Sequence, residues 1–565
     1  MINIPRKAIT VSGLMLFAIL MLLAYLFGPN VSSTSSADIG PWYSVAPPIL
    51  AVIVAFMTRK LFLSLGLAIL AGGILAVYRY SASVADALLS GPVTAVGYLF
   101  GAISGGWNLQ VLAFVFIILS MISVMVVSGG FVGVVAYLTR FTKTRRSTKF
   151  MTAIMGLIIF IDDYANTMIV GSSMRPISDL RKISREKLAF IIDSTSAPVA
   201  GLAIVSTWIG FEVGLFGEVS ESLELGVNGY SMFFDAIAFR FYCVLMLLFV
   251  FINILSQSDF GPMLSAERKI LQSHGKQTAN PKEIAALNRI AGKLSKHAIS
   301  ALLPLLVLMS TLLTGLWWDG GGFVKMQTNS FAWLYPTVWL DVIANTKNNT
   351  SILVLASFFG LLTAGLCAAV VSKIKLAQIR LAMFAGFKAG LLPAAILILA
   401  WALKSSCDDL ATGEFLAASM GQAVSPFLFP FLVFLTAAIV SFGTGTSWGT
   451  MSILIPTAIP VAYALDGNTY GLITIISLGA ILDGAIFGDH CSPISDTTIM
   501  SSIASSCDHI EHVRTQLPYS LLVGLIAMLF GYLPAAFGVS PLICFAFAIA
   551  ILSIVFFFLS KKVVV

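Results

Sequence analysis

The sequence predicts an all-α polytopic membrane protein with about 11–14 transmembrane segments, including two hairpin or broken-helix elements. We expect two structural repeats, in an inverted arrangement. Of the 565 residues 58% are hydrophobic and only 10% are charged, and the mean hydropathy is +0.95. Soluble domains carry roughly 25% charged residues. The net charge of +7 does not indicate nucleic-acid binding, because the basic residues cluster in short loops, as the positive-inside rule expects.

Fourteen apolar windows are candidates for membrane segments. In chain order they lie near 8–28, 43–58, 61–79, 108–139, 150–173, 188–211, 231–256, 299–318, 350–372, 381–403, 426–465, 469–488, 517–538 and 541–560. The first follows a basic start and resembles a signal peptide, but no convincing cleavage site follows it, so we expect a transmembrane helix.

Two of these windows are too long for one crossing, which needs ~20 residues. The window 108–139 is interrupted by Ser128–Gly130, and 426–465 is interrupted by Gly443–Gly449. We therefore expect a hairpin or a broken helix in each. Non-helical backbone at membrane depth is tolerated where protein or a wet cavity covers it.

The charges of the loops predict the orientation. The loop after residue 211 contains glutamates and no base, whereas basic residues occupy Lys7, Arg59–Lys60, Arg140–Lys149, Arg175–Lys187 and the polar segment 257–298. This asymmetry predicts a multi-pass membrane protein with a cytoplasmic N-terminus. We expect a transmembrane half at 1–256, a cytoplasmic polar linker at 257–298 with a short helix near 281–293, and a second half at 299–565.

Acidic residues inside apolar windows are the main functional signal. Asp162 and Asp163 lie side by side within 150–173. A carboxylate at a helix centre costs roughly 2.5–3.5 kcal/mol by insertion scales and is rarely kept without a task. The second half has a comparable motif, with Asp483, Asp489, His490 and Asp496 after an apolar segment. We expect the motif at Asp162 to correspond to the one at Asp489.

The residues around these acids are rich in oxygen, which a hard cation such as Na⁺ prefers. We expect ion or proton binding by Asp162, Asp163, Asn166, Thr167, Asp489, Ser492 and Asp496, with Asp163 and Asp489 as Na⁺ ligands. Burial favours the protonated acid and a bound cation favours the carboxylate, so one aspartate can hold either ion. The alternative is that these residues cap helices and form hydrogen bonds between them.

Further polar patches interrupt apolar stretches. Thr444, Thr446 and Ser447 lie in the glycine-rich break and either face a cation or belong to close helix packing. Asp193 either lines the permeation path or lies beside a helix kink at Pro198. His490 is either a proton relay or a neutral hydrogen-bonding residue.

Two other pairs of polar residues receive structural interpretations. We interpret Arg240 and Asp235 as anchors near one end of 231–256, and find no convincing buried arginine. His509 and His512 are typical of a polar face at the membrane surface.

In these motifs the chain resembles the NhaC family of Na⁺/H⁺ antiporters, within the ion-transporter superfamily. The resemblance rests on Asp162–Asp179, Ile183–Ala200, Gly443–Met451, Gly488–Ser502 and Asp508–Tyr519. It implies an inner-membrane carrier that exchanges Na⁺ for H⁺, in a family with malate/lactate-type members. The ion role is carried over to Asp162, Asp163, Asn166, Asp193, Thr446, Ser447, Asp489, His490, Ser492 and Asp496. The chain departs from the family in its extended N-terminus and in its polar segments at 212–230 and 319–349, which leaves the subfamily open.

We therefore expect a secondary transporter, not an enzyme, that exchanges Na⁺ for H⁺ by alternating access at a carboxylate-lined midplane site. The alternative is a Na⁺- or H⁺-coupled carrier of a small organic anion or amino acid. We expect no cofactor; Na⁺ and H⁺ are the cargo. The expected partners are the lipid bilayer and these ions, with an organic anion and a second copy of the chain left open and no nucleic acid.

Overall fold

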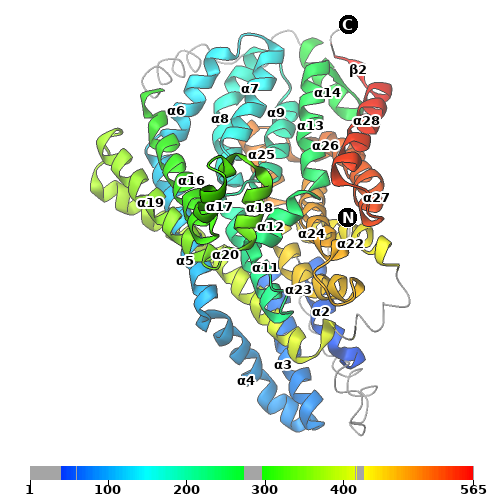
Figure 1. The fold of residues 1–565 in the computed structure, drawn as a ribbon. Helices are drawn as coiled ribbons and strands as arrows, with labels where there is room; N and C mark the ends of the chain where they lie inside the picture. The colour runs from blue at the N-terminus through cyan, green and yellow to red at the C-terminus, as the bar shows by residue number, and fades with distance from the viewer. Residues whose placement is uncertain (1–39, 59, 273–294, 414, 416–424, 564–565) are drawn as a thin grey trace.

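The computed structural model describes residues 40–58, 60–272, 295–413, 415 and 425–563, and these are mainly helical (Figure 1). The all-α class is confirmed. The predicted membrane helix at 8–28 and the short helix near 281–293 lie outside the described residues.

The helices of the first half follow one another closely. They are η1 (Trp42–Val45), α2 (Ala46–Thr58), α3 (Leu61–Ser81), α4 (Val84–Ser104), α5 (Gly106–Val127), α6 (Gly130–Leu138), η2 (Thr139–Phe141), α7 (Arg145–Ile158), α8 (Asp163–Leu180), α9 (Arg185–Ser194), α10 (Ala197–Ala200), α11 (Thr207–Ser222), α12 (Gly229–Ile237) and α13 (Phe241–Ser256).

The rest of the described chain is also mainly helical and contains two short strands. The elements are β1 (Ser258–Asp259), α14 (Gly261–Gln272), η3 (Ser295–Ala298), α16 (Ile299–Asp319), α17 (Gly322–Thr328), η4 (Ala332–Leu334), α18 (Pro336–Ala344), α19 (Asn349–Val370), α20 (Leu376–Asp409), η5 (Pro426–Leu428), α22 (Phe429–Thr444), α23 (Ser447–Leu465), α24 (Leu472–Cys491), α25 (Asp496–Ser505), α26 (His509–Ile526), the π-helical η6 (Ala527–Tyr532), α27 (Leu533–Ala536), α28 (Pro541–Leu559) and β2 (Lys561–Lys562).

Eleven helical segments of the described chain are long and apolar enough to cross a membrane. They are α3, α4, α5, α16, α19, α20, η5–α22, α23, α24, α26–α27 and α28. The pair α12 and α13, bent by 47°, is a twelfth candidate. The predicted range of 11–14 segments is confirmed. The sequence windows missed α4, whose mean hydropathy of 1.4 is low for a span because glycine, serine and Asp86 dilute its apolar residues.

The apolar windows break at more places than expected. The window 426–465 breaks between α22 and α23, and 108–139 breaks between α5 and α6, both as predicted. The windows 150–173 and 188–211, expected as single spans, also break. Residues 159–162 separate α7 from α8, and irregular backbone around the short α10 separates α9 from α11.

The order of these breaks is the same in both halves. In the first half α7, a break and α8 are followed by α9, a break and α11; in the second half α22, a break and α23 are followed by α24, a break and α25. This order pairs Asp162 with Thr446, and Asp193 with Asp489. The correspondence of Asp162 with Asp489 that the motifs suggested is therefore replaced. In space the halves interleave, since α25 packs against α8 and α9, and α23 packs against α11 (Figure 1).

The start of the predicted linker is packed against the body of the protein. Strand β1 pairs with β2 in antiparallel register, Ser258 opposite Lys562. Helix α14 packs against α9 and α26, and its Glu267 is buried in an ion pair with Lys149, Nζ to Oε2 2.7 Å. The division of the chain at 257–298 stays a prediction. The first residues of this segment, in β1 and α14, pack against the C-terminal strand and against helices of both halves.

Candidate functional site

Four helices begin close together, and each begins at a capping side chain. Asp162 accepts a hydrogen bond from a backbone N–H of α8, Ser206 from α11, Thr446 from α23 and Ser495 from α25. Short oxygen-bearing side chains satisfy the free N–H groups of a first helical turn. The breaks in the apolar windows are therefore capped helix starts, and each leaves polar groups at that point.

The four helix starts line one cavity with a volume of about 310 Å³. Its polar lining is Ser123, Asp162, Asp163, Tyr164, Thr207, Thr446, Ser447, Trp448, Asp496 and Thr497. Its apolar wall comes from α5 and α20. The lining contains three carboxylates and no lysine, arginine or histidine. The N-terminal ends of the helices favour negative charge at this place.

Each of the three carboxylates accepts hydrogen bonds from its surroundings. Asp162 Oδ1 accepts from Ala165 N at 2.7 Å, and Oδ2 accepts from Thr207 Oγ1 at 3.1 Å. Asp163 is 3% exposed and accepts from Tyr164 N at 3.0 Å. Asp496 accepts from the hydroxyl of Tyr164, which links the two halves. Among the described residues no three His, Cys, Asp or Glu side chains converge as a metal cluster, so a cation here would need hydroxyl or carbonyl ligands as well.

A second group of acids lies behind the cavity wall. Thr497 lines the cavity and donates to Asp489 Oδ2 at 2.6 Å. The hydroxyl of Thr498 is 3.4 Å from both the Asp489 carbonyl and Asp193 Oδ2. Asp193 also accepts from Ser501 at 3.0 Å and from Gln516 at 2.5 Å. Polar contacts therefore continue from the cavity to Asp489 and on to Asp193.

Comparison with known proteins identifies the family. The Na⁺/H⁺ antiporter family model matches residues 199–535, more than half of the chain. An uncharacterized protein of Haemophilus influenzae is 30% identical over 92% of this chain and 95% of its own length. The chain belongs to the Na⁺/H⁺ antiporter family. It is a multi-pass membrane transporter.

Relatives with named substrates match this antiporter over shorter stretches. The malate-2H⁺/Na⁺-lactate antiporter of Bacillus subtilis is 35% identical over 21% of this chain and 24% of its own length. The arginine/ornithine antiporter of Halobacterium salinarum is 32% identical over 24% of this chain and 26% of its own length.

Two solved transporters share the fold of the antiporter. Neisseria gonorrhoeae MtrF, described as one of a class of antimetabolite efflux pumps, superposes with a TM-score of 0.56 at 13% identity, over 95% of each chain. The Alcanivorax borkumensis YdaH transporter gives 0.53 at 15% identity, over 81% of this chain and 90% of its own. At such identity the likeness concerns the fold alone.

Five predicted site residues meet in the cavity of this antiporter: Asp162, Asp163, Thr446, Ser447 and Asp496. Asp489 and Asp193 form the group behind it, so the two expected Na⁺ ligands, Asp163 and Asp489, do not share one lining. His490 is fully buried, with Nδ1 2.9 Å from the hydroxyl of Tyr242.

The other predicted residues lie outside the cavity lining. Asn166 Nδ2 donates to the carbonyls of Gly156 at 2.7 Å and Thr195 at 3.0 Å, and so ties the two breaks of the first half. Ser492 donates to the carbonyl of Phe442 at 2.8 Å. Thr444 donates to a carbonyl of its own helix, and Thr167 is buried outside the cavity lining. For Asn166, Ser492 and Thr444 the observed contacts match the alternative of hydrogen bonding, whereas the buried hydroxyl of Thr167 has no partner among the described residues.

The prediction for Arg240 was wrong. Its side chain is fully buried, with Nε 2.8 Å from Asp483 Oδ1 and Nη1 3.5 Å from Glu212 Oε1. Glu212, expected in an acidic loop, lies inside α11. The signal was available, because both residues are flanked by apolar residues on each side. The triad ties α11 to α24 and lies outside the cavity lining.

Three contributors were missed or misplaced. Tyr164 and Thr207 line the cavity. Thr207 was missed because it lies inside the window 188–211, which was expected as one span. The Ser–Thr pair before Trp208 is nevertheless typical of a helix start. His512 was expected at the membrane surface, but it is buried with Nε2 3.6 Å from Asp193 Oδ2.

Proposed function

We propose that this protein exchanges Na⁺ for H⁺ at the cavity between α8, α11, α23 and α25. The supporting observation is a lining with three carboxylates, several hydroxyls and no basic side chain. Hard cations take oxygen ligands, and a carboxylate that binds a cation releases its proton. Competition of the two ions for the same aspartates couples their movements. Na⁺ and H⁺ are cargo in this scheme.

We propose that the proton leaves the cavity through the polar groups behind the wall. Thr497 joins the cavity to the Asp489 carboxylate, and the hydroxyl of Thr498 lies 3.4 Å from both the backbone carbonyl of Asp489 and Asp193 Oδ2. We assign Asp163 and Asp496 to cation binding, and Asp489 and Asp193 to proton transfer away from them.

Alternating access requires a site that opens to one side at a time. Broken helices with polar ends at a shared site are typical of such carriers. We propose that the basic face, with α7, α14 and β2 at the top of Figure 1, is cytoplasmic and that the membrane is the inner membrane of the cell.

The test is Na⁺-driven dissipation of a pH gradient in proteoliposomes. Asp163→Asn and Asp489→Asn each keep the size and shape of the side chain but cannot exchange a proton, so we expect each to reduce exchange to background. Asp179→Asn on the same helix α8, where Asp179 pairs with Arg185, is the matched control and should retain exchange. Wild-type vesicles in which Na⁺ does not collapse the gradient would refute the proposal.

A second candidate is a coupled carrier of a small organic solute. The volume of about 310 Å³ is much more than one water needs, ~10–15 Å³ by the same measure. The excess of acids favours a solute with an ammonium or guanidinium group over a dicarboxylate, and a relative is named for arginine and ornithine. Counterflow of labelled arginine, malate and lactate into loaded proteoliposomes decides between them.

A further inference from the structure

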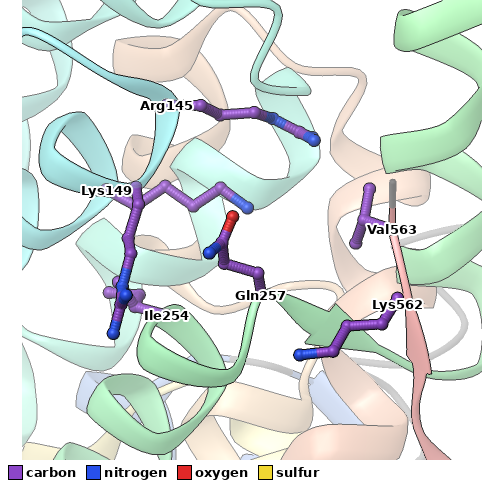
Figure 2. A pocket seen from close by; sticks show the side chains of 7 residues that line it. Arg145, Lys149, Ile254, Gln257, Lys562 and Val563 are labelled. Carbon is purple, nitrogen blue, oxygen red and sulfur yellow. The ribbon is translucent and has the colours of Figure 1, made fainter. Parts of the chain in front are cut away.

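A second cavity, of about 230 Å³, lies at the opposite end of α7 from the aspartates. It opens between the start of α7 and strand β2, and its lining includes Arg145, Arg146, Lys149, Gln257, Lys562 and Val563. Figure 2 shows Arg145 and Lys149 reaching in from one side and Lys562 from the other. The cavity is therefore surrounded by positive charge on two elements about 400 residues apart in the chain.

The positive charge is only partly compensated. Among the described residues, Glu267 pairs with Arg145 at 2.5 Å and with Lys149 at 2.7 Å. Its other oxygen already accepts from Ser184 N at 2.7 Å. Lys562 Nζ donates to the backbone carbonyl of Ser256 at 2.6 Å, which carries no charge. Four cationic side chains in the lining thus share one carboxylate.

Donors for a ligand remain at this place. Arg145 Nε is buried and has no acceptor within the described residues. Arg146 and Lys562 are exposed at the rim, and neither has a carboxylate partner in the described part of the chain. Arg268, whose Nη2 donates to the Lys562 carbonyl at 2.8 Å, adds a further positive charge beside β2.

These features match the chemistry of a phosphate group. Guanidinium groups bind phosphate through paired N–H donors, and lysine adds a point charge. Basic pockets between membrane helices on the cytoplasmic side bind anionic headgroups. The cavity exceeds the ~10–15 Å³ needed for one water many times over and so has room for such a group.

We propose that this pocket binds a phosphate-bearing anion, supplied either by the headgroup of an anionic phospholipid or by free phosphate. The anion bridges α7 and β2 and relieves the repulsion between their cations. Since α7 extends from this pocket to the break that precedes Asp162 and α8, the bound anion also holds the helix that leads into the cavity acids.

The test measures the thermal unfolding midpoint of the purified full chain in neutral detergent at constant ionic strength. The probes are phosphatidylglycerol, phosphatidylcholine as the zwitterionic reference, and inorganic phosphate. We expect phosphatidylglycerol or phosphate to raise the midpoint by about 3 °C relative to the reference, because a ligand that binds only the folded state stabilises it. The double variant Arg146→Gln/Lys562→Gln should lose this shift, because it removes two cations of the rim.

The control is Arg380→Gln, which removes an exposed cation at the start of α20 and should keep the full shift. If the double variant does not fold, the single variant Arg146→Gln replaces it. We expect the single variant to lose about half of the rise in the unfolding midpoint. A rise with phosphate identifies free phosphate as sufficient, and a rise with phosphatidylglycerol alone identifies the lipid headgroup. Absence of any rise, or an equal rise in the double variant, overturns the proposal.

Discussion

Thr497 lies between the cavity and the acids behind it. Its hydroxyl reaches Asp489 Oδ2 at 2.6 Å, while the residue itself belongs to the cavity lining. Asp489 Oδ1 has no partner within the described residues. A buried carboxylate with one free oxygen is expensive unless it is protonated or binds a cation. The position suits a group that gains and loses a proton.

Thr497→Val should slow exchange about tenfold or more. A hydrogen bond to a charged group contributes ~1.5–3 kcal/mol, and each 1.4 kcal/mol is about tenfold. The measurement is the initial rate of Na⁺-driven pH change in proteoliposomes. Thr436→Val is the control, since that hydroxyl bonds a carbonyl of its own helix at an exposed site. Equal rates for both variants would remove Thr497 from the proton route.

At the scale of elements, the breaks are positioned by one another. Gly445 ends α22 in the left-handed region with φ +71°, which most residues avoid. A Cβ built there would lie 2.7 Å from the carbonyl oxygen of Ile494, in the break between α24 and α25. The two breaks of the second half therefore touch through backbone, and only glycine permits this approach.

Gly445→Ala should lower both stability and exchange. The left-handed conformation costs an alanine ~1–2 kcal/mol, and the contact with Ile494 must open as well. Gly467→Ala is a matched control, because Gly467 has φ +73° but open space around a built Cβ. We expect Gly445→Ala to lower the unfolding midpoint more than Gly467→Ala does, and to reduce exchange selectively. A similar response of the two variants would show that backbone strain alone matters.

Helix α14 is fastened by a buried carboxylate outside the membrane-spanning segments. Burial by itself raises the pKa of Glu267, but Lys149 and Arg145 hold it below its ordinary value. A depressed pKa means that the ion pairs stabilise the fold above pH ~4.3, the ordinary glutamate pKa. This stabilisation is lost as pH falls through the lower pKa of the folded state.

Glu267→Gln should therefore lower the unfolding midpoint at pH 7, by an amount equivalent to about 3 kcal/mol, because buried Lys149 and partly buried Arg145 lose their partner. The difference from wild type should shrink as pH falls below about 4, where wild-type Glu267 also becomes neutral. Midpoints measured from pH 3 to 8 check this, with exposed Glu221→Gln as the control. A difference that does not depend on pH would contradict the ion-pair account.

At the scale of the whole molecule, residues of both halves form the cavity and the group of acids behind it. Tyr164 of the first half donates to Asp496 of the second, and Thr498 and Ser501 of the second half donate to Asp193 of the first. Helix α25 packs against α8 and α9. A movement of one half against the other would therefore change the contacts of the acids at the cavity.

Tyr164→Phe should raise the KM for Na⁺ about tenfold while the protein stays folded. It removes the hydroxyl that positions Asp496 across the halves, a contact of ~1.5–3 kcal/mol, but keeps the ring. Tyr335→Phe, at an exposed ring, is the control. The readout is exchange rate against Na⁺ concentration; an unchanged KM would show that Asp496 needs no partner from the first half.

Parts of this site were predictable, and parts were not. The acids at Asp162 and Asp163 and the glycine-rich break were visible, because polar residues in an apolar stretch are costly and so mark a function. The burial of Arg240 was missed although its neighbours are apolar. The grouping of Asp496 with Asp163, and of Asp489 with Asp193, was not visible, because these pairs are about 300 residues apart.

Composition and local hydropathy by themselves determined the membrane class and the approximate number of membrane segments, since the energy of a residue in a bilayer depends mainly on its own chemistry. The sequence motifs by themselves were enough to indicate the family. The tertiary structure decided which helix starts meet, which acids line the cavity and which lie behind it, and where basic residues surround a second pocket. These outcomes depend on packing between distant helices. The sterics and hydrogen bonds that decide such packing exist only in the folded chain.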